Sequence, residues 1–305
     1  MKANREKWND LKCLTIRRYN LDESIFTIQL HEIVFENWGI PFYLLPFGDI
    51  HDGNANCDED GFGEWCGWAR TKPRARFIGM GDYQEWFSES ERVGMNSVRL
   101  HQSSKKTIED FAKDAVRKFF KKISFMKGKL LGLMEGNHFY PFENGMTSTQ
   151  YLCQLLGCKY LGATALTRLS FKYAKGNKTS KIDVFSHHGK GASRLVGGSL
   201  NTVQQMAECA EADIYLMGHD HKKSIGMSSR LALTDGRNGL HIKERKLLYA
   251  RTGSFLKGYE EGKPSYVSQK LLNPCDLGTV KIELTPRNKK GDTCDKTIID
   301  IHASL

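Results

Sequence analysis

The sequence contains no long hydrophobic run. None of its apolar stretches approaches the roughly 18 residues that a membrane-spanning helix needs. Residues 1–5 lead directly into polar sequence, without the apolar segment of a secretory signal. We therefore expect a soluble, cytoplasmic protein with no membrane partner, and the sequence leaves its protein partners unknown.

Several familiar catalytic templates are also absent. The eight cysteines are scattered and form no Cys-x-x-Cys pair, which disfavours a cysteine-rich zinc site and predicts free thiols. There is no His-Glu-x-x-His motif, and Lys257 stands where a phosphate-binding loop around Gly262 would need a glycine. The glycines that follow His188 favour a loop rather than a dinucleotide site.

The composition is that of a globular protein with a basic balance. A chain of 305 residues with 40% hydrophobic content can bury a large core, and no internal repeat or low-complexity linker divides it. We expect a single domain over residues 1–305, with its motifs at 42–259 and C-terminal strands at 279–303 completing the sheets. The net charge of +10 favours polyanionic partners.

Alternating strand and helix patterns predict an α/β fold with a mixed sheet. Five short apolar runs, each followed by a polar motif, read as buried strands: 40–47, 76–80, 130–134, 182–185 and 214–217. Helical spacing covers 107–126, 147–156 and 200–210. Further strands without intervening helices are expected at 25–35, 166–173, 246–252, 279–284 and 297–301. The segments 51–76 and 88–104 are expected to be loops, the first with one short helix.

Residue types that bind metal ions follow those five strands. The motifs are Gly48-Asp49-Ile50-His51, Gly81-Asp82, Gly136-Asn137-His138, Ser186-His187-His188-Gly189 and Gly218-His219-Asp220-His221. Residues two apart on an extended segment point to the same side, so Asp49 with His51, and His219 with His221, could each bind one ion. Ligands gather at the carboxyl ends of strands in α/β sheets, so we expect these motifs to converge.

In this order and context, the motifs resemble those of the calcineurin-like metallophosphoesterase family over residues 42–259. The resemblance implies an α/β sandwich of mixed central sheets flanked by helices, holding two divalent metal ions. It implies that Asp49, His51 and His221 hold the first ion and that Asp82 bridges both. It assigns Asn137, His187 and His219 to the second ion, with His188 as the alternative to His187. Oxygen and nitrogen ligands suit Mn²⁺, Fe, Zn²⁺ or Ni²⁺, and the family favours Mn²⁺.

The resemblance also suggests catalytic roles. His138 is the candidate proton donor to the leaving oxygen, a role that typically contributes roughly 10²–10⁴-fold; a buried hydrogen-bonding histidine is the alternative. The family commonly has a second aspartate where this chain has Glu85, so we expect Glu85 to bond His138 unless it is a surface residue. No arginine soon follows Asp82, which disfavours the protein serine/threonine phosphatase branch.

Aromatic and basic residues near the motifs bear on the substrate. Tyr83, Phe139 and Tyr140 could stack on bases, or could pack in the core. A basic cluster (Arg70, Lys72, Arg74 and Arg76) precedes the strand that leads to Asp82, and lysines line the helix at 107–126. Charge of this kind attracts phosphate backbones.

We therefore predict a hydrolase, a metal-dependent phosphoesterase that cleaves phosphodiester bonds in nucleic acid or nucleotides. Two alternatives stay open. One is a phosphomonoesterase acting on a small phosphate or a phosphoprotein, and the other is a non-catalytic scaffold that has kept the fold.

Overall fold

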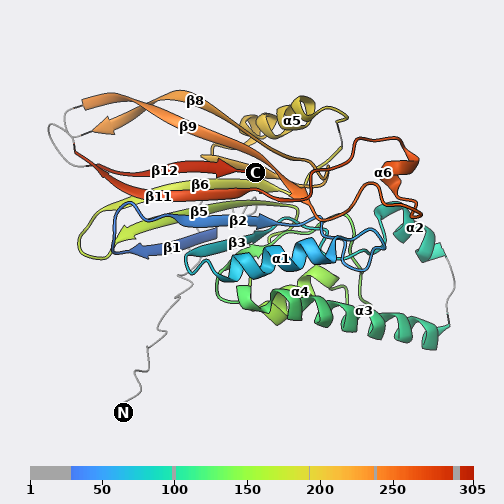
Figure 1. Cartoon of the computed structure of the whole chain (residues 1–305). Coiled ribbons are helices and arrows are strands. Elements are labelled where there is room, and N and C mark those ends of the chain that lie inside the picture. The colour runs from blue at the N-terminus through green and yellow to red at the C-terminus, as the bar shows by residue number, and fades with distance from the viewer. Residues whose placement is uncertain (1–28, 98–100, 192, 237–238, 291–295) are drawn as a thin grey trace, which may run out of the picture.

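A computed structural model of the chain describes residues 29–97, 101–191, 193–236, 239–290 and 296–305. The fold is α/β, with mixed sheets and flanking helices, as the sequence predicts. Two sheets stack face to face in Figure 1, with helices on their outer sides. Part of the strand predicted at 25–35 lies outside the described residues; the described part is β1 (Gln29–Phe35).

The first sheet has five strands in the order β12-β11-β2-β3-β4. Its parallel part consists of β2 (Phe42–Phe47), β3 (Ala75–Gly79) and β4 (Leu130–Leu133). The antiparallel strands β11 (Lys281–Lys289) and β12 (Lys296–Ser304) complete it. Leu44 and Leu45, neighbours on β2, are both fully buried, which is typical of a parallel strand covered on both faces.

The second sheet has seven strands in the order β1-β5-β6-β7-β9-β10, with β8 paired to β9. Its strands after β1 are β5 (Thr164–Tyr173), β6 (Thr179–His187), β7 (Ile214–Met217), β8 (Lys223–Gly236), β9 (Gly239–Ser254) and β10 (Gly278–Thr279). β6, β7 and the inner half of β9 run parallel. Their carboxyl ends therefore lie at one edge of the sheet.

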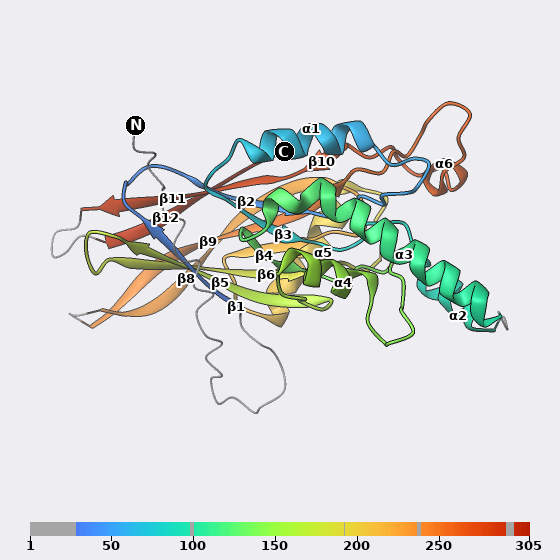
Figure 2. The same cartoon turned by 90° about the horizontal axis from the view of Figure 1, so that it is seen from below.

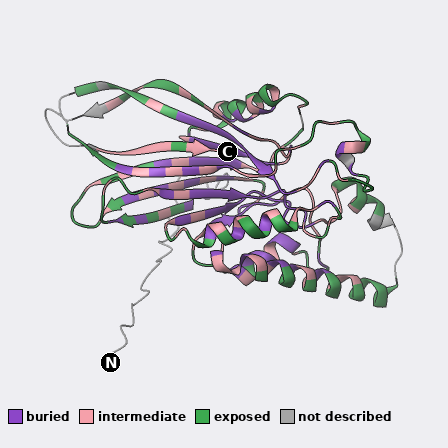
Figure 3. Ribbon diagram, in the orientation of Figure 1, coloured by how far each residue is buried: buried purple, intermediate pink, exposed green. Residues whose placement is uncertain are grey.

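The core lies between the sheets and beneath the helices. Residues of both sheets form one buried cluster, to which Ile78 and Leu216 belong, and Figure 3 shows the buried residues concentrated there. Helices α1 (Glu59–Arg70), α3 (Gln102–Ile123) and α4 (Ser148–Leu156) cover the outer face of the first sheet (Figure 2). Helix α5 (Val196–Cys209) covers the second sheet (Figure 1). The molecule thus has four layers: helices, sheet, sheet and helix.

Helix α3 differs in detail from the sequence prediction. It starts five residues earlier than predicted, at Gln102 rather than 107, and a short 3₁₀ turn (Ser124–Met126) follows it. Its buried face is formed by Ala112, Val116, Phe119 and Ile123. Phe111, one of the apolar residues at helical spacing in 107–126, is 65% exposed. The buried stripe of α3 is therefore rotated relative to the one that the sequence predicts.

Two helices and most of one long hairpin were missed by the sequence analysis. Helix α2 (Glu89–Ser97) lies within the predicted loop 88–104. β8 and β9 form a long hairpin of which only 246–252 was predicted. Its outer part, called here the β8–β9 arm (229–236 and 239–246), carries four exposed apolar side chains on one face: Leu231, Leu233, Leu240 and Ile242. A short helix, α6 (Tyr266–Gln269), follows β9. Among the described residues, no helix has the length and apolarity to cross a membrane.

Candidate metal centre

The candidate ligands lie in the turns that follow the parallel strands. Asp49 and His51 follow β2, Asp82 follows β3, Asn137 follows β4, and His188 follows β6. His219 and His221 follow β7. The sequence prediction that these motifs converge is confirmed as geometry, because Asp and His side chains from both sheets form clusters that could hold a metal ion.

The backbone at these positions is left-handed, not extended as the sequence analysis assumed. Asp49 and His51 have φ of 49° and 52°, and Asp82 has φ of 49°. His219 and His221 have φ of 73° and 59°. Residues other than glycine rarely adopt this backbone conformation, which costs about 1–3 kcal/mol per residue. Hydrogen bonds hold it: the amide of Asp49 donates to Gly81 O at 3.0 Å, and that of His51 to Asp82 O at 3.1 Å.

Two glycines give the ligands the space they occupy. A Cβ on Gly136 would lie 1.9 Å from Asp82 Oδ1, and a Cβ on Gly81 would lie 2.5 Å from His188 Nδ1. Gly81 also has φ of 100°, which glycine alone adopts easily. These motif glycines are therefore needed because the chain passes directly against ligand atoms.

The first group, called here the Asp49 cluster, consists of Asp49, His51 and His221, whose ligand atoms lie within 4.8 Å of one another. Nε2 of His221 is 3.3 Å from Nε2 of His51 and 3.7 Å from Asp49 Oδ1. Asp49 is fully buried, and its Oδ1 has no hydrogen-bond partner among the described residues. A buried carboxylate oxygen without a donor costs free energy, so this atom is suited to a cation.

The second group, the Asp82 cluster, consists of Asp82, His188 and His219. His188 Nε2 lies 3.4 Å from Asp82 Oδ2. Asn137 Oδ1 lies 2.9 Å from both His188 Nε2 and His219 Nδ1, which adds an amide oxygen to the group. Asp82 Oδ2 is also 3.9 Å from His51 Nε2 of the Asp49 cluster. Asp82 therefore lies between the two groups.

The structure brings His188, and not His187, to this site. The sequence analysis preferred His187 because it comes first after the apolar run 182–185. Strand β6, however, continues through His187, which pairs with Thr164 and Met217 inside the sheet. Side chains alternate along a strand, and His187 keeps its Nδ1 buried without a hydrogen-bond partner among the described residues. The strand ends later than its hydrophobicity indicates, so the expected register was one residue too early.

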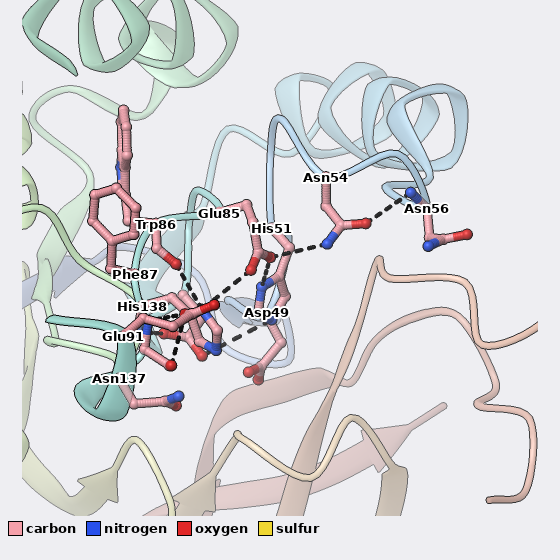
Figure 4. A network of polar contacts seen from close by, with 12 residues as sticks. Asp49, His51, Asn54, Asn56, Glu85, Trp86, Phe87, Glu91, Asn137 and His138 are labelled. Carbon is pink, nitrogen blue, oxygen red and sulfur yellow. Dashed lines mark hydrogen bonds and ion pairs between the residues drawn. The ribbon is translucent and has the colours of Figure 1, made fainter. Parts of the chain in front are cut away.

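His138 and Glu85 lie beside the Asp49 cluster, as Figure 4 shows. Nδ1 of His138 is 3.2 Å from Glu85 Oε1 and 3.0 Å from the carbonyl oxygen of Trp86. The predicted contact between Glu85 and His138 is thus present. Sequence reasoning missed that Glu85 Oε2 also lies 2.7 Å from His51 Nδ1. Glu85 therefore joins the proposed proton donor to a proposed metal ligand.

Burial and charge shift the pKa values of these groups in opposite directions. Burial raises the pKa of Asp49 to about 7, against the effect of His188. Burial and the neighbouring His51 lower the pKa of His221 to about 3, which keeps its imidazole neutral and able to bind metal. Burial would lower the pKa of His188, but Asp82 and Asp49 raise it to about 9. The carboxylates therefore favour a positive charge at this point, which a proton or a cation can supply.

His138 itself is held in its protonated form. Burial opposes this, but hydrogen bonding to Glu85 and the charge of Asp82 raise its pKa to about 9. Burial would raise the pKa of Glu85, but its hydrogen bonds to His138 and His51 lower it well below the ordinary range. The ionised glutamate thus stabilises the protonated form of the histidine, which is the form that can donate a proton.

The three aromatic candidates have different surroundings. Tyr83 is 3% exposed and its hydroxyl donates to Met134 O at 3.0 Å, so it packs in the core and the substrate-binding prediction for it is corrected. Phe139 is partly exposed, and the guanidinium of Arg92 lies 3.9 Å from its ring centroid. Tyr140 is also partly exposed and lies 5.6 Å from the ring of Trp86.

The predicted basic cluster lies away from the candidate ligands, near the amino end of β3. Arg70, Lys72 and Arg74 stand over the rings of Phe125, Trp68 and Phe42, respectively. Each of these positively charged side chains is therefore held against an aromatic ring by a cation–π contact. On α3, Lys122 pairs with Asp52.

Sequence reasoning missed Arg251 of β9, which is 1% exposed and donates to Gly218 O directly behind the histidines. No local motif marks it, because its partners come from other elements.

A comparison with known proteins finds no matching family model, no matching curated protein and no matching solved structure.

Proposed function

We propose that this chain is a phosphoesterase with two divalent metal ions, with the sandwich fold and site of the calcineurin-like metallophosphoesterases. The observation that carries the proposal is the pair of adjacent groups, the Asp49 cluster and the Asp82 cluster, with Asp82 between them. Asn137 and His138 complete the set of metal ligands and proton donor that the family resemblance implies. A core that only needed packing would not bury this many ionisable groups together.

The donor set fits two cations. The side chains offer carboxylate oxygen, neutral imidazole and amide oxygen, which suit Mn²⁺, Fe, Zn²⁺ or Ni²⁺. Asp49, His51 and His221 would hold one ion, and Asn137, His188 and His219 the other, with Asp82 shared. The partnerless Oδ1 of Asp49 supports this assignment. We propose Mn²⁺ as the first ion to test.

Two bound cations would supply charge neutralisation at the phosphate and lower the pKa of a water molecule towards about 7. The chemistry that the ions would supply is a hydroxide nucleophile, formed as that water releases a proton to solvent, for displacement of the leaving alcohol at phosphorus. We assign His138 as the donor of the proton that the leaving oxygen takes up, because its pKa is raised and it lies at the edge of the site. Glu85 orients the ring through Nδ1, which leaves Nε2 to face the substrate.

The proposed substrates are phosphodiesters, with nucleic acid or nucleotides as the favoured class. Support comes from the net charge of +10 and from the partly exposed aromatic side chain of Tyr140, two residues after His138 in the sequence. The basic cluster near β3 lies away from the ligands and gives no support to this substrate class.

The first experiment compares two chromogenic substrates with purified, chelator-treated protein reloaded with Mn²⁺. We expect hydrolysis of bis(p-nitrophenyl) phosphate in preference to p-nitrophenyl phosphate. Asp82→Asn should reduce the rate by at least the roughly 10–100-fold that changes next to metal ligands typically cause. Asp110→Asn, at an exposed carboxylate on α3, is the matched control and should not differ from the wild type.

Each alternative has its own outcome in this experiment. Preference for the monoester would replace the proposal with a phosphomonoesterase. Depleted metal sites and no hydrolysis of either substrate would favour the scaffold.

A further inference from the structure

Behind the two histidines that follow β7 lies an ion pair with almost no access to solvent. Arg251 of β9 is 1% exposed and Asp220 is 8% exposed, with its side chain fully buried. Arg251 is among the largest fully buried side chains of the described chain. Burying two charges is costly unless hydrogen bonds satisfy them, so their partners show what the pair is for.

Those partners tie three elements together. Arg251 Nη1 donates to Gly218 O at 2.7 Å, and its Nε donates to Ser199 O, in the first turn of α5, at 3.1 Å. The Ser199 hydroxyl donates to Asp220 Oδ2, which also lies 3.5 Å from Arg251 Nε. Asp220 Oδ1 accepts from the amide of Lys222 at 3.2 Å. The pair therefore fixes the turn after β7 to β9 and to α5.

The turn that the pair holds in place contains two residues with a left-handed backbone conformation. Asp220 stands between His219 and His221, which have φ of 73° and 59°. Both conformations are sparsely populated for residues with a Cβ and persist only where the surroundings impose them. His219 belongs to the Asp82 cluster and His221 to the Asp49 cluster. One buried anchor thus stands behind a ligand of each group.

We propose that Asp220 and Arg251 are positioning residues that set the affinity of both metal ions at once. The proposal rests on the function proposed above. Neither residue belongs to a cluster of possible ligands; the pair acts by holding His219 and His221 in their left-handed backbone conformation. Groups that orient metal ligands typically contribute 10–100-fold in metal affinity.

The test needs variants that do not leave a lone buried charge. The double variant Asp220→Asn, Arg251→Met removes both charges and keeps similar shapes. Arg251→Lys keeps the charge but has no planar fork to reach both Ser199 O and Gly218 O. The matched control is Asp213→Asn, Arg245→Met, a pair that also joins β9 to the segment before β7, with Nε to Oδ1 at 2.7 Å, but lies away from the ligand turn.

Isothermal titration with Mn²⁺ measures affinity independently of turnover. We expect two bound ions in the wild type and in the control. The double variant and Arg251→Lys should bind both ions 10–100-fold more weakly, while thermal unfolding of their metal-free forms stays cooperative. If the double variant does not fold, Arg251→Lys decides the question.

Three results would overturn this inference while leaving the proposed function intact. They are unchanged affinity in Arg251→Lys, weakening of only one of the two ions, and an equal loss of affinity in the control pair. Absence of bound metal in the wild type would instead remove the proposed function, and this inference with it.

Discussion

Glu85 is the residue at which the candidate centre and the proposed proton donor meet. One carboxylate oxygen faces His138 Nδ1 and the other faces His51 Nδ1. A carboxylate on the far nitrogen of a ligating imidazole fixes the ring and raises its basicity. The same side chain fixes His138, so a change here should affect chemistry more than substrate binding.

Replacing Glu85 by Gln should lower kcat on the diester substrate by roughly 10–100-fold, with a smaller effect on KM. The amide keeps the size of the side chain but removes the charge that holds both imidazoles. Steady-state kinetics with Mn²⁺ provides the measurement. Glu89→Gln, an exposed glutamate at the start of α2, is the control. An unchanged kcat in the Glu85 variant would remove its assigned role.

Gly136 can be tested at the same scale. A Cβ at this position would lie 1.9 Å from Asp82 Oδ1, so Gly136→Ala should displace the proposed bridging carboxylate and abolish binding of at least one ion. Metal content per chain, measured after Mn²⁺ loading and desalting, checks this. Gly63→Ala on α1 has open space around the added methyl group and should leave the metal content as it is. Full loading of the Gly136 variant would contradict the close contact described here.

Among the elements, the turns after the parallel strands could be predicted more reliably than the ends of those strands. Apolar runs preceding Asp49, Asp82 and His219 predicted strands β2, β3 and β7, because strands buried on both faces are uniformly hydrophobic. β6 carries polar residues to its end, as Ser186 and His187 illustrate, so hydrophobicity alone could not place its last residue. The choice between His187 and His188 therefore needed the tertiary pairing.

Other differences have the same origin in tertiary contacts. Tyr83 follows a ligand in sequence, but its side chain packs against Phe47, with 5.8 Å between the ring centroids. The sequence gives no sign of which side the ring takes. The β8–β9 arm was missed although apolar residues alternate along it, at 231 and 233 and at 240 and 242. This pattern usually marks a half-buried strand, but here the apolar face is exposed.

Strand β1 makes stability dependent on pH through His31. Burial, with the charges of Lys159 and Arg76, lowers the pKa of His31 to about 4 from an ordinary value near 6.5. The unfolded chain therefore takes up a proton at a higher pH than the folded chain. Stability should fall as pH drops from about 6.5 to about 4, and level off below that for this group.

Denaturant unfolding at pH 7 and pH 5 measures the effect. His31→Leu should lose less stability between these pH values than the wild type does. His302→Leu, at an exposed histidine on β12, serves as the control and should follow the wild type. Equal losses in all three proteins would show that His31 does not titrate as described.

At the scale of the whole molecule, the proposed ligands are divided between the two sheets. Asp49, His51, Asp82 and Asn137 extend from the first sheet, and His188, His219 and His221 extend from the second. An ion held by both sets would join the two sheets at one edge of the core. Binding to the folded chain alone stabilises it by mass action, by about 2.7 kcal/mol when the free ion is at 100 times its Kd.

Mn²⁺ at that concentration should therefore raise Tm, by roughly 5 °C, relative to the chelator-treated protein. Differential scanning calorimetry measures the shift. Asp82→Asn should show little of it, because the shared ligand is lost, whereas Asp110→Asn should show all of it. Equal shifts in the two variants would mean that the ion binds elsewhere.

The β8–β9 arm affects how each of these measurements has to be made. Its four outward-facing apolar side chains, Leu231, Leu233, Leu240 and Ile242, are 70% to 78% exposed. Exposed apolar surface of this kind is an interaction site or a liability for aggregation. We therefore expect this face to promote self-association as the protein concentration rises, unless a mild detergent covers it. Specific activity should therefore be recorded across a dilution series before any variant is judged inactive.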